Sequence, residues 1–216
     1  MGFYSRFVFP WVLEKGTAVK ALREPRRRVL ASARGRILEI GFGTGVNLEH
    51  YPAHVEIITV VEPALELSKY ARRRIESTGR KVEVHVLGAE ELPFDNESFD
   101  TVVSTLTLCS IAPIELALRQ IRRVMKRDGR FLYLEHGLHP NPSVARWQNR
   151  LDPLQQRLCG GCHLNRSANE LLKGAGFRIA AVNEYQMPGM PGIFGWMAEG
   201  VAAIDETQGA PAAKSP

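Results

Sequence analysis

The sequence predicts an α/β fold of the Rossmann-like type, a mostly parallel sheet with helices on both faces. Short β-rich runs alternate with helical segments from residue 36 onward, and a glycine-rich turn follows the first run directly. Such alternation favours parallel strands whose connecting helices cover the sheet. With 216 residues, of which 44% are hydrophobic and 24% charged, the chain is long enough for one packed core. We also expect an antiparallel strand at the C-terminal edge of the sheet.

The individual elements follow from apolar periodicity. The β-rich runs predict strands at 36–41, 56–62, 82–87, 99–105 and 130–136. Helices are predicted between them at 64–79 and 113–129, the second from apolar residues at helical spacing. Beyond residue 136 the pattern predicts helices at 144–158 and within 161–177, a strand at 179–185, and a turn and strand ending at 204.

These elements predict a single domain over residues 1–205, with an N-terminal lid or helical segment at 1–30. The tail at 206–216 has too little apolar content to pack and is expected to be disordered. The apolar start at 7–13 contains Pro10 and is much shorter than the roughly 20 residues of a membrane span. With three cysteines and no export signal, we expect reduced thiols and a cytoplasmic protein.

The net charge of the chain does not by itself identify a binding partner. A net charge of +5 suits an anionic partner without identifying one, and solvated helix faces account for it equally well. Nucleic acid is not expected as a partner, because no recognised binding module accompanies the arginines. Aromatic residues near Arg6, Lys15 and the cluster Arg26–Arg28 leave open a weak peripheral contact with the inner membrane surface. The oligomeric state stays open.

The segment ILEIGFGTGVN, residues 37–47, carries the strongest functional signal. An apolar strand runs into Gly41, Gly43 and Gly45, where the backbone can adopt positive φ and lie close to a ligand. Ligands of open α/β sheets bind at this carboxyl end of the strands. The dinucleotide pattern G-x-G-x-x-G would need its third glycine at Val46, and the acid Glu39 would repel a phosphate. A pyrophosphate is therefore not the favoured ligand.

The order E-x-G-x-G-x-G resembles the first motif of the class I S-adenosylmethionine (SAM)-dependent methyltransferases. Four later segments resemble the family in the same order: VVEP, GAEELPF, ESFDTVVST and RVMKRDGRFLYLEH. The resemblance implies that SAM is the cofactor, S-adenosylhomocysteine the product, and the fold that of a class I methyltransferase. It implies contacts of the glycine loop with the amino-acid half of SAM, and of later residues with the ribose, adenine and methionine. The implied SAM-binding residues are Glu39, Gly41, Gly43, Gly45, Asn47, Glu62, Pro63, Ala89, Glu90, Thr105 and Leu106.

Within this family the chain is similar to a subgroup that includes the membrane-associated alkyl thiol methyltransferases of animals. The similarity lies in TLTLCSI (105–111), YLEHG (133–137), WQNRLDP (147–153) and GCHLNR (161–166). It implies methyl transfer to a small, rather apolar acceptor, with a thiol as the leading choice. Phospholipid headgroup amines and quinone-like rings are the alternative acceptors. A SAM- or haem-binding regulator is the non-enzymatic alternative.

Methylation of a thiol requires loss of its proton, because the thiolate is the nucleophile. The candidate bases are His136, Asp152 and His163, each of which also has a plain structural interpretation. Four residues are candidates for the acceptor pocket or a lid over it: Tyr4, Phe7, Trp11 and Cys109.

The segment CGGCH, residues 159–163, matches the C-x-x-C-H pattern for attachment of c-type haem. Covalent haem belongs to exported chains, and a zinc site would need further ligands, for which only Cys109, His136 and His139 are candidates. The resemblance accounts for GCHLNR without a metal. We therefore expect no bound metal.

Overall fold

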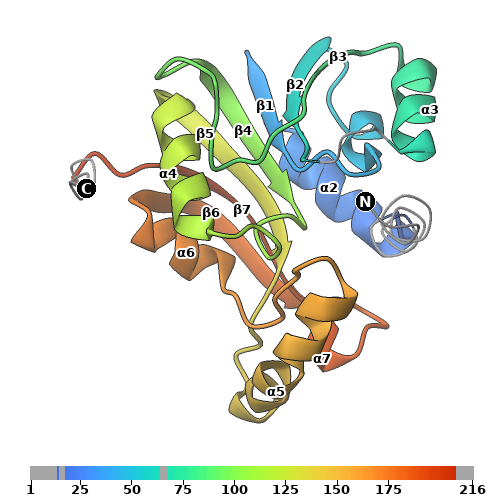
Figure 1. The fold of residues 1–216 in the computed structure, drawn as a ribbon, viewed down its shortest axis with the longest axis vertical. Coiled ribbons are helices and arrows are strands. Elements are labelled where there is room, and N and C mark those ends of the chain that lie inside the picture. The colour runs from blue at the N-terminus through green and yellow to red at the C-terminus, as the bar shows by residue number, and fades with distance from the viewer. Residues whose placement is uncertain (1–13, 15–17, 64–67, 208–216) are drawn as a thin grey trace.

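The computed structural model describes residue 14 and residues 18–63 and 68–207 (Figure 1). The predictions for Tyr4, Phe7 and Trp11 and for the tail beyond residue 207 lie outside this part of the chain. Its strands form one seven-stranded sheet in the order β3-β2-β1-β4-β5-β7-β6. The strand order reverses between β1 and β4, which lie side by side. The glycine-rich turn follows β1 and therefore lies at this switch point.

Strands β1 to β5 pair in parallel, and β6 and β7 complete a mixed sheet. Strand β7 pairs antiparallel with both β5 and β6, so β6 forms the outer edge and β7 is inserted beside the parallel block. The predicted fold class is thus confirmed, with the antiparallel pair at one edge. The strands are β1 (Ile37–Ile40), β2 (Ile57–Val61), β3 (Lys81–His85), β4 (Phe99–Thr105), β5 (Met125–His136), β6 (Phe177–Gln186) and β7 (Trp196–Ile204).

Helices cover both faces of the sheet, as Figure 1 shows. Neighbouring strand residues face opposite ways, and the core accordingly divides into two clusters: Phe131 and Tyr133 of β5 lie in one, Leu132 and Leu134 in the other. The first cluster includes α4 and α6, and the second includes α2 and α3. The helices are α2 (Arg23–Leu30), α3 (Lys69–Thr78), α4 (Ile114–Val124), α5 (Pro142–Leu158), α6 (Ala168–Gly174) and α7 (Gly192–Gly195).

Helix α4 is shorter than the sequence predicts. Its apolar residues are buried as expected, but it ends at Val124, because Met125 adopts extended backbone angles and begins β5. Met125 pairs with Phe99 of β4 and is fully buried. The apolar residue that had suggested a further helical turn therefore belongs to the sheet.

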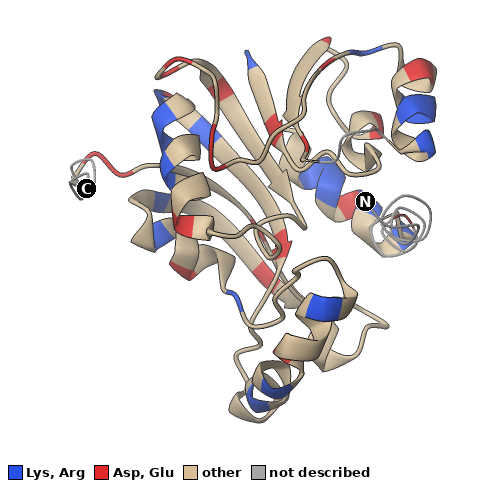
Figure 2. Cartoon of the chain, in the orientation of Figure 1, with Lys and Arg blue, Asp and Glu red and all other residues tan. Residues whose placement is uncertain are grey.

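The parallel strands end at one edge of the sheet, and the turns that follow them gather there. These turns are residues 41–45 after β1, the segment after β2 beginning with Glu62, and the segments 86–90 and 106–112. Lys and Arg lie on several helices, α2, α3, α4 and α5 among them (Figure 2). Among the described helices, none is long and apolar enough to span a bilayer.

Candidate functional site

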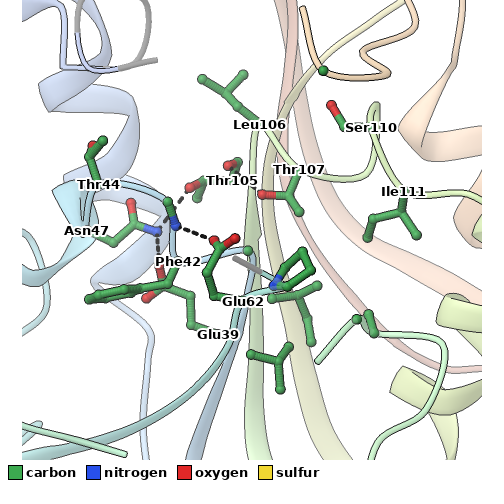
Figure 3. Close-up of a pocket in the computed structure, with 18 of the residues that line it drawn as sticks. Glu39, Phe42, Thr44, Asn47, Glu62, Thr105, Leu106, Thr107, Ser110 and Ile111 are labelled. Atoms are coloured by element: carbon green, nitrogen blue, oxygen red, sulfur yellow. Dashed lines mark hydrogen bonds between the residues drawn. The ribbon is translucent and has the colours of Figure 1, made fainter. Parts of the chain in front are cut away.

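A pocket of about 400 Å³ opens at the carboxyl ends of the parallel strands. Its walls come from the glycine loop and from the residues after β2, β3 and β4 (Figure 3). This volume lies within the range of ~300–1,000 Å³ typical of small-molecule sites. The residues that the sequence predicts for SAM binding are therefore expected in the walls of this pocket.

The three glycines of the loop all adopt the left-handed backbone conformation, with φ of 75° at Gly41, 54° at Gly43 and 72° at Gly45. A Cβ atom at Gly41 would lie 2.4 Å from the Thr107 side chain, which belongs to the opposite wall. Gly45 precedes a 3₁₀ turn, Val46–Glu49, that carries Asn47 toward β1. Glycine is required here by the backbone conformation and, at Gly41, by lack of space.

Glu39 lines the pocket and belongs to a buried polar network. Asn47 Nδ2 donates to Glu39 Oε1 at 3.0 Å, and the Tyr51 hydroxyl donates to Oε2 at 2.8 Å. Burial raises the pKa of Glu39 to about 7, although these hydrogen bonds and the charge of Arg26 act in the opposite direction. Near neutral pH, a cation bound beside Glu39 would favour its ionised form.

Arg26 completes this network from helix α2. Its Nε donates to Asn47 Oδ1 at 3.1 Å, and its side chain is only 2% exposed. Burial lowers the pKa of Arg26 to about 10, so the guanidinium remains charged at neutral pH. Of the arginine cluster considered for a membrane contact, Arg26 thus lines the pocket, and Arg28 pairs with Glu199 at 2.9 Å.

Glu62 connects the end of β2 to the glycine loop. The Gly43 amide donates to Glu62 Oε2 at 2.7 Å, as drawn in Figure 3, and the Glu62 side chain lines the pocket. A carboxylate at this position of a nucleotide-binding fold accepts hydrogen bonds from ribose hydroxyls. Glu62 can therefore serve both the loop and a ligand.

The turn after β4 forms the opposite wall and is held by a buried acid, Glu135 of β5. Glu135 accepts hydrogen bonds from the Ser104 hydroxyl at 2.8 Å and from the amides of Thr107 and Leu108 at 3.0–3.2 Å. Leu106, in the same turn, has a backbone φ of 54°, which is uncommon for a residue with a side chain of this size. This strain is maintained by the surrounding contacts, as is frequent in ligand-binding walls.

Comparison with known proteins identifies the family. A family model described as "Methyltransferase domain" matches residues 38–133. The rat (Rattus norvegicus) thiol S-methyltransferase TMT1B is 31% identical over 168 residues, 76% of this chain and 66% of that protein. Its human (Homo sapiens) counterpart is 30% identical over 79% of this chain and 69% of that protein. The chain belongs to the class I SAM-dependent methyltransferases. It spans about two thirds of the length of these two relatives.

Further relatives act on other acceptors. The phosphatidylethanolamine N-methyltransferase of Cereibacter sphaeroides is 32% identical over 61% of this chain and 67% of that protein. Among solved structures, the 1,6-didemethyltoxoflavin-N1-methyltransferase of Burkholderia thailandensis is 18% identical with a TM-score of 0.66, covering 94% of this chain and 87% of that one. That likeness concerns the fold alone.

Most residues that the methyltransferase motifs imply for SAM binding line one pocket. Gly45 is the exception; it shapes the turn instead. Sequence reasoning missed several lining residues because they lie outside the motifs or within their unspecified positions. Arg26, for instance, belongs to a run of arginines that is typical of a basic helix face. The lining residues that were not predicted include Arg26, Phe42, Thr44, Thr107, Ser110, Ile111, Ala112 and Gly160.

The three candidate bases do not line the pocket. Asp152 accepts hydrogen bonds from the Leu164 amide and from Gln156 Nε2, both at 2.7 Å, and lies 3.0 Å from His163 Nδ1. Burial alone would raise the pKa of Asp152, but these hydrogen bonds outweigh it and hold the pKa below its usual value.

The third candidate base, His136, contacts a cysteine: its Nε2 lies 3.1 Å from Cys162 Sγ. Cys109, expected beside the acceptor, is buried behind the pocket wall.

The raised pKa of Glu39 predicts that SAM affinity depends on pH. Below about 7 the free protein holds Glu39 mostly protonated, and a bound ammonium favours the carboxylate, so binding should expel a proton. Affinity should therefore fall with decreasing pH, by up to about tenfold per pH unit. Calorimetry across this range should show the dependence in the wild type and not in Glu39→Gln. Parallel pH profiles for both proteins would contradict it.

Proposed function

We propose that this protein transfers the methyl group of SAM to a small, apolar thiol. The family supplies the cofactor, and the relatives with thiol S-methyltransferase activity suggest the acceptor. When bound, SAM supplies an electrophilic methyl group on a sulfonium sulfur. The residues described above determine how such a ligand is held and what can approach it.

The pocket suits SAM in its shape and in its charge. Glycine backbone replaces side chains at the loop, where a Cβ atom on Gly41 would collide with Thr107. Glu39 offers a buried carboxyl for an ammonium, and Glu62 offers a carboxylate for ribose hydroxyls. Ala89 and Glu90, for which the resemblance implies contacts with adenine, also line the pocket. We propose that these residues bind SAM and fix the direction of its methyl group.

Beside these relatives, the structural observation that supports a thiol is the chemical character of the wall beyond Leu106. The residues there are small, apolar or hydroxyl-bearing: Thr107, Ser110, Ile111, Ala112 and Gly160. Such a wall suits an uncharged acceptor and excludes water from the reacting atoms. An ammonium acceptor, by contrast, would have to give up the hydration of its charge against such a wall.

Transfer is an in-line displacement, in which the acceptor sulfur forms a bond to the methyl carbon as the carbon–sulfonium bond breaks. The chain's task is to align the acceptor and to remove its proton. We propose that His163, oriented by Asp152, supports this proton loss. Two contacts support this proposal: His163 N donates to the Cys109 carbonyl at 2.9 Å, and Gly160 of the same loop lines the pocket.

His163→Gln is accordingly expected to lower kcat with a thiol by roughly 10²-fold, the lower end of what a positioned base contributes. SAM affinity should stay within about twofold, because His163 does not line the pocket. The exposed residue His54 provides a matched control, since His54→Gln should change neither quantity. Wild-type kcat in His163→Gln, across pH 6 to 9, would remove this residue from the mechanism.

The acceptor class is tested by S-adenosylhomocysteine formation with an uncharged alkyl thiol, the matching alcohol and phosphatidylethanolamine vesicles. We expect product with the thiol alone. Product with the vesicles alone would favour the second candidate, N-methylation of a phospholipid headgroup, which the Cereibacter relative suggests. SAM binding without product from any acceptor, including a quinol, would favour a regulatory protein.

A further inference from the structure

Three side chains of metal-ligand type meet outside the SAM pocket: Cys109, His136 and Cys162. Their ligand atoms all lie within 4.8 Å of one another. The two sulfur atoms are 3.6 Å apart, and His136 Nε2 lies 3.1 Å from Cys162 Sγ. Cys109 is buried and the other two are partly buried, so the cluster is largely shielded from solvent.

The three residues come from separate parts of the chain. Cys109 lies in the turn after β4, His136 is the last residue of β5, and Cys162 lies between α5 and α6. Hydrogen bonds to backbone carbonyls fix two of these segments against each other. His163 N donates to the Cys109 carbonyl at 2.9 Å, and the Arg166 side chain donates through Nη1 to the carbonyls of Leu108 and Cys109 at 2.8 and 3.1 Å. The cluster is therefore built by the fold rather than by side chains that meet at an open surface.

The spacing of these atoms suits a tetrahedral metal ion. Zinc–sulfur bonds of ~2.3 Å and zinc–nitrogen bonds of ~2.0 Å at tetrahedral angles separate two sulfurs by about 3.8 Å and a sulfur from a nitrogen by about 3.6 Å. Two observed separations, 3.6 and 3.1 Å, are within about half an ångström of these values. The third pair of ligand atoms, in Cys109 and His136, lies within 4.8 Å, so binding of one ion would bring these two side chains closer together.

The donor set also selects the metal. Two thiolates and one imidazole are soft and intermediate ligands, which favour zinc over the oxygen-preferring Mg²⁺ and Ca²⁺. Two polar groups lie close enough to support the sulfurs as thiolates: the Ser110 hydroxyl, 3.5 Å from Cys109 Sγ, and Gln155 Nε2, 3.8 Å from Cys162 Sγ. Such surrounding contacts orient ligands and tune a bound metal.

We propose that Cys109, His136 and Cys162 bind one zinc ion, with the fourth coordination position open to water or another small ligand. The ion ties the turn after β4 and the α5–α6 loop to the end of β5. Both of these segments contribute to the pocket wall, through Ser110 and Gly160. The site differs from the haem pattern in the sequence, because it uses Cys162 but neither Cys159 nor His163. It also departs from the sequence-based expectation of no metal.

The test uses the full chain, purified under reducing conditions, freed of metal by a chelator and titrated with zinc. We expect about one tightly bound zinc ion per chain and a raised unfolding temperature. Cobalt in its place should give the thiolate charge-transfer and tetrahedral d–d absorption bands. Cys162→Ser and His136→Gln should each weaken binding at least tenfold and alter the cobalt spectrum.

Cys159→Ser is the matched control, since Cys159 belongs to the same C-x-x-C segment but not to the cluster. It should keep full stoichiometry and an unchanged spectrum. Absence of tight binding in reduced wild type would overturn the proposal, as would an equal loss of zinc in Cys159→Ser. Circular dichroism of each variant shows whether it folds, and if Cys162→Ser does not, His136→Gln decides the outcome.

Discussion

Glu62→Ala is expected to weaken SAM binding by about 1.5–3 kcal/mol, or roughly 10- to 150-fold, the cost of losing a hydrogen-bond partner that carries a charge. Glu62 lines the pocket at the end of β2 and also accepts the Gly43 amide at 2.7 Å. The substitution therefore removes a contact proposed for the ribose and, at the same time, a contact that holds the glycine loop. Isothermal titration calorimetry with SAM measures the combined loss.

Two variants separate these contributions. Glu62→Gln keeps a side-chain oxygen that can accept the Gly43 amide but removes the charge, so it should lie between the wild type and Glu62→Ala. Glu56→Ala removes an exposed acid near the start of β2 and should bind SAM as the wild type does. Unchanged affinity in Glu62→Ala, in protein with a normal unfolding temperature, would remove Glu62 from the site.

Gly41→Ala should damage both stability and SAM binding. Its φ of 75° costs about 1–3 kcal/mol for a residue with a Cβ atom. The added atom would lie 2.4 Å from the Thr107 side chain, so the glycine loop and the opposite wall must move apart. We expect SAM affinity to fall by about tenfold or more, equivalent to ~1.4 kcal/mol. Thermal unfolding and calorimetry measure the two effects.

Gly79→Ala distinguishes loop geometry from a general cost of replacing glycine. Gly79 ends α3 with a φ of 65°, but a Cβ atom there would meet nothing within 4 Å. This variant should lose about 1 kcal/mol of stability and keep its SAM affinity. If Gly41→Ala behaved the same way, the close approach of the loop to Thr107 would have no role in binding.

The cofactor side of the pocket was predictable from sequence because its determinants are local. An apolar strand, three alternate glycines and an acid at the end of the next strand fall into short segments, and their order fixes which sheet edge they share. Positive φ at Gly41, Gly43 and Gly45 agrees with the conformational reason for expecting glycine there. Even so, the assignment of these residues to SAM stays a prediction until binding is measured.

Features that depend on docking between distant segments were not predictable in the same way. Arg26 belongs to a run of arginines that resembles a solvated helix face, yet the packing of α2 buries it against Asn47. Glu135 alternates with apolar residues in an ordinary strand pattern, and its role in holding the turn after β4 appears only when β4 and β5 pair. The meeting of Cys109, His136 and Cys162 likewise depends on where the α5–α6 loop returns to the sheet.

The most direct test of the proposed function follows a labelled methyl group. Purified protein is incubated with SAM that carries a trideuterated methyl group and an uncharged alkyl thiol, and both products are quantified by mass spectrometry. The account predicts a trideuterated methyl thioether and S-adenosylhomocysteine in equal amounts, both greatly reduced in Glu62→Ala at limiting SAM. Failure to form the thioether, in protein shown by calorimetry to bind SAM, would contradict thiol methylation.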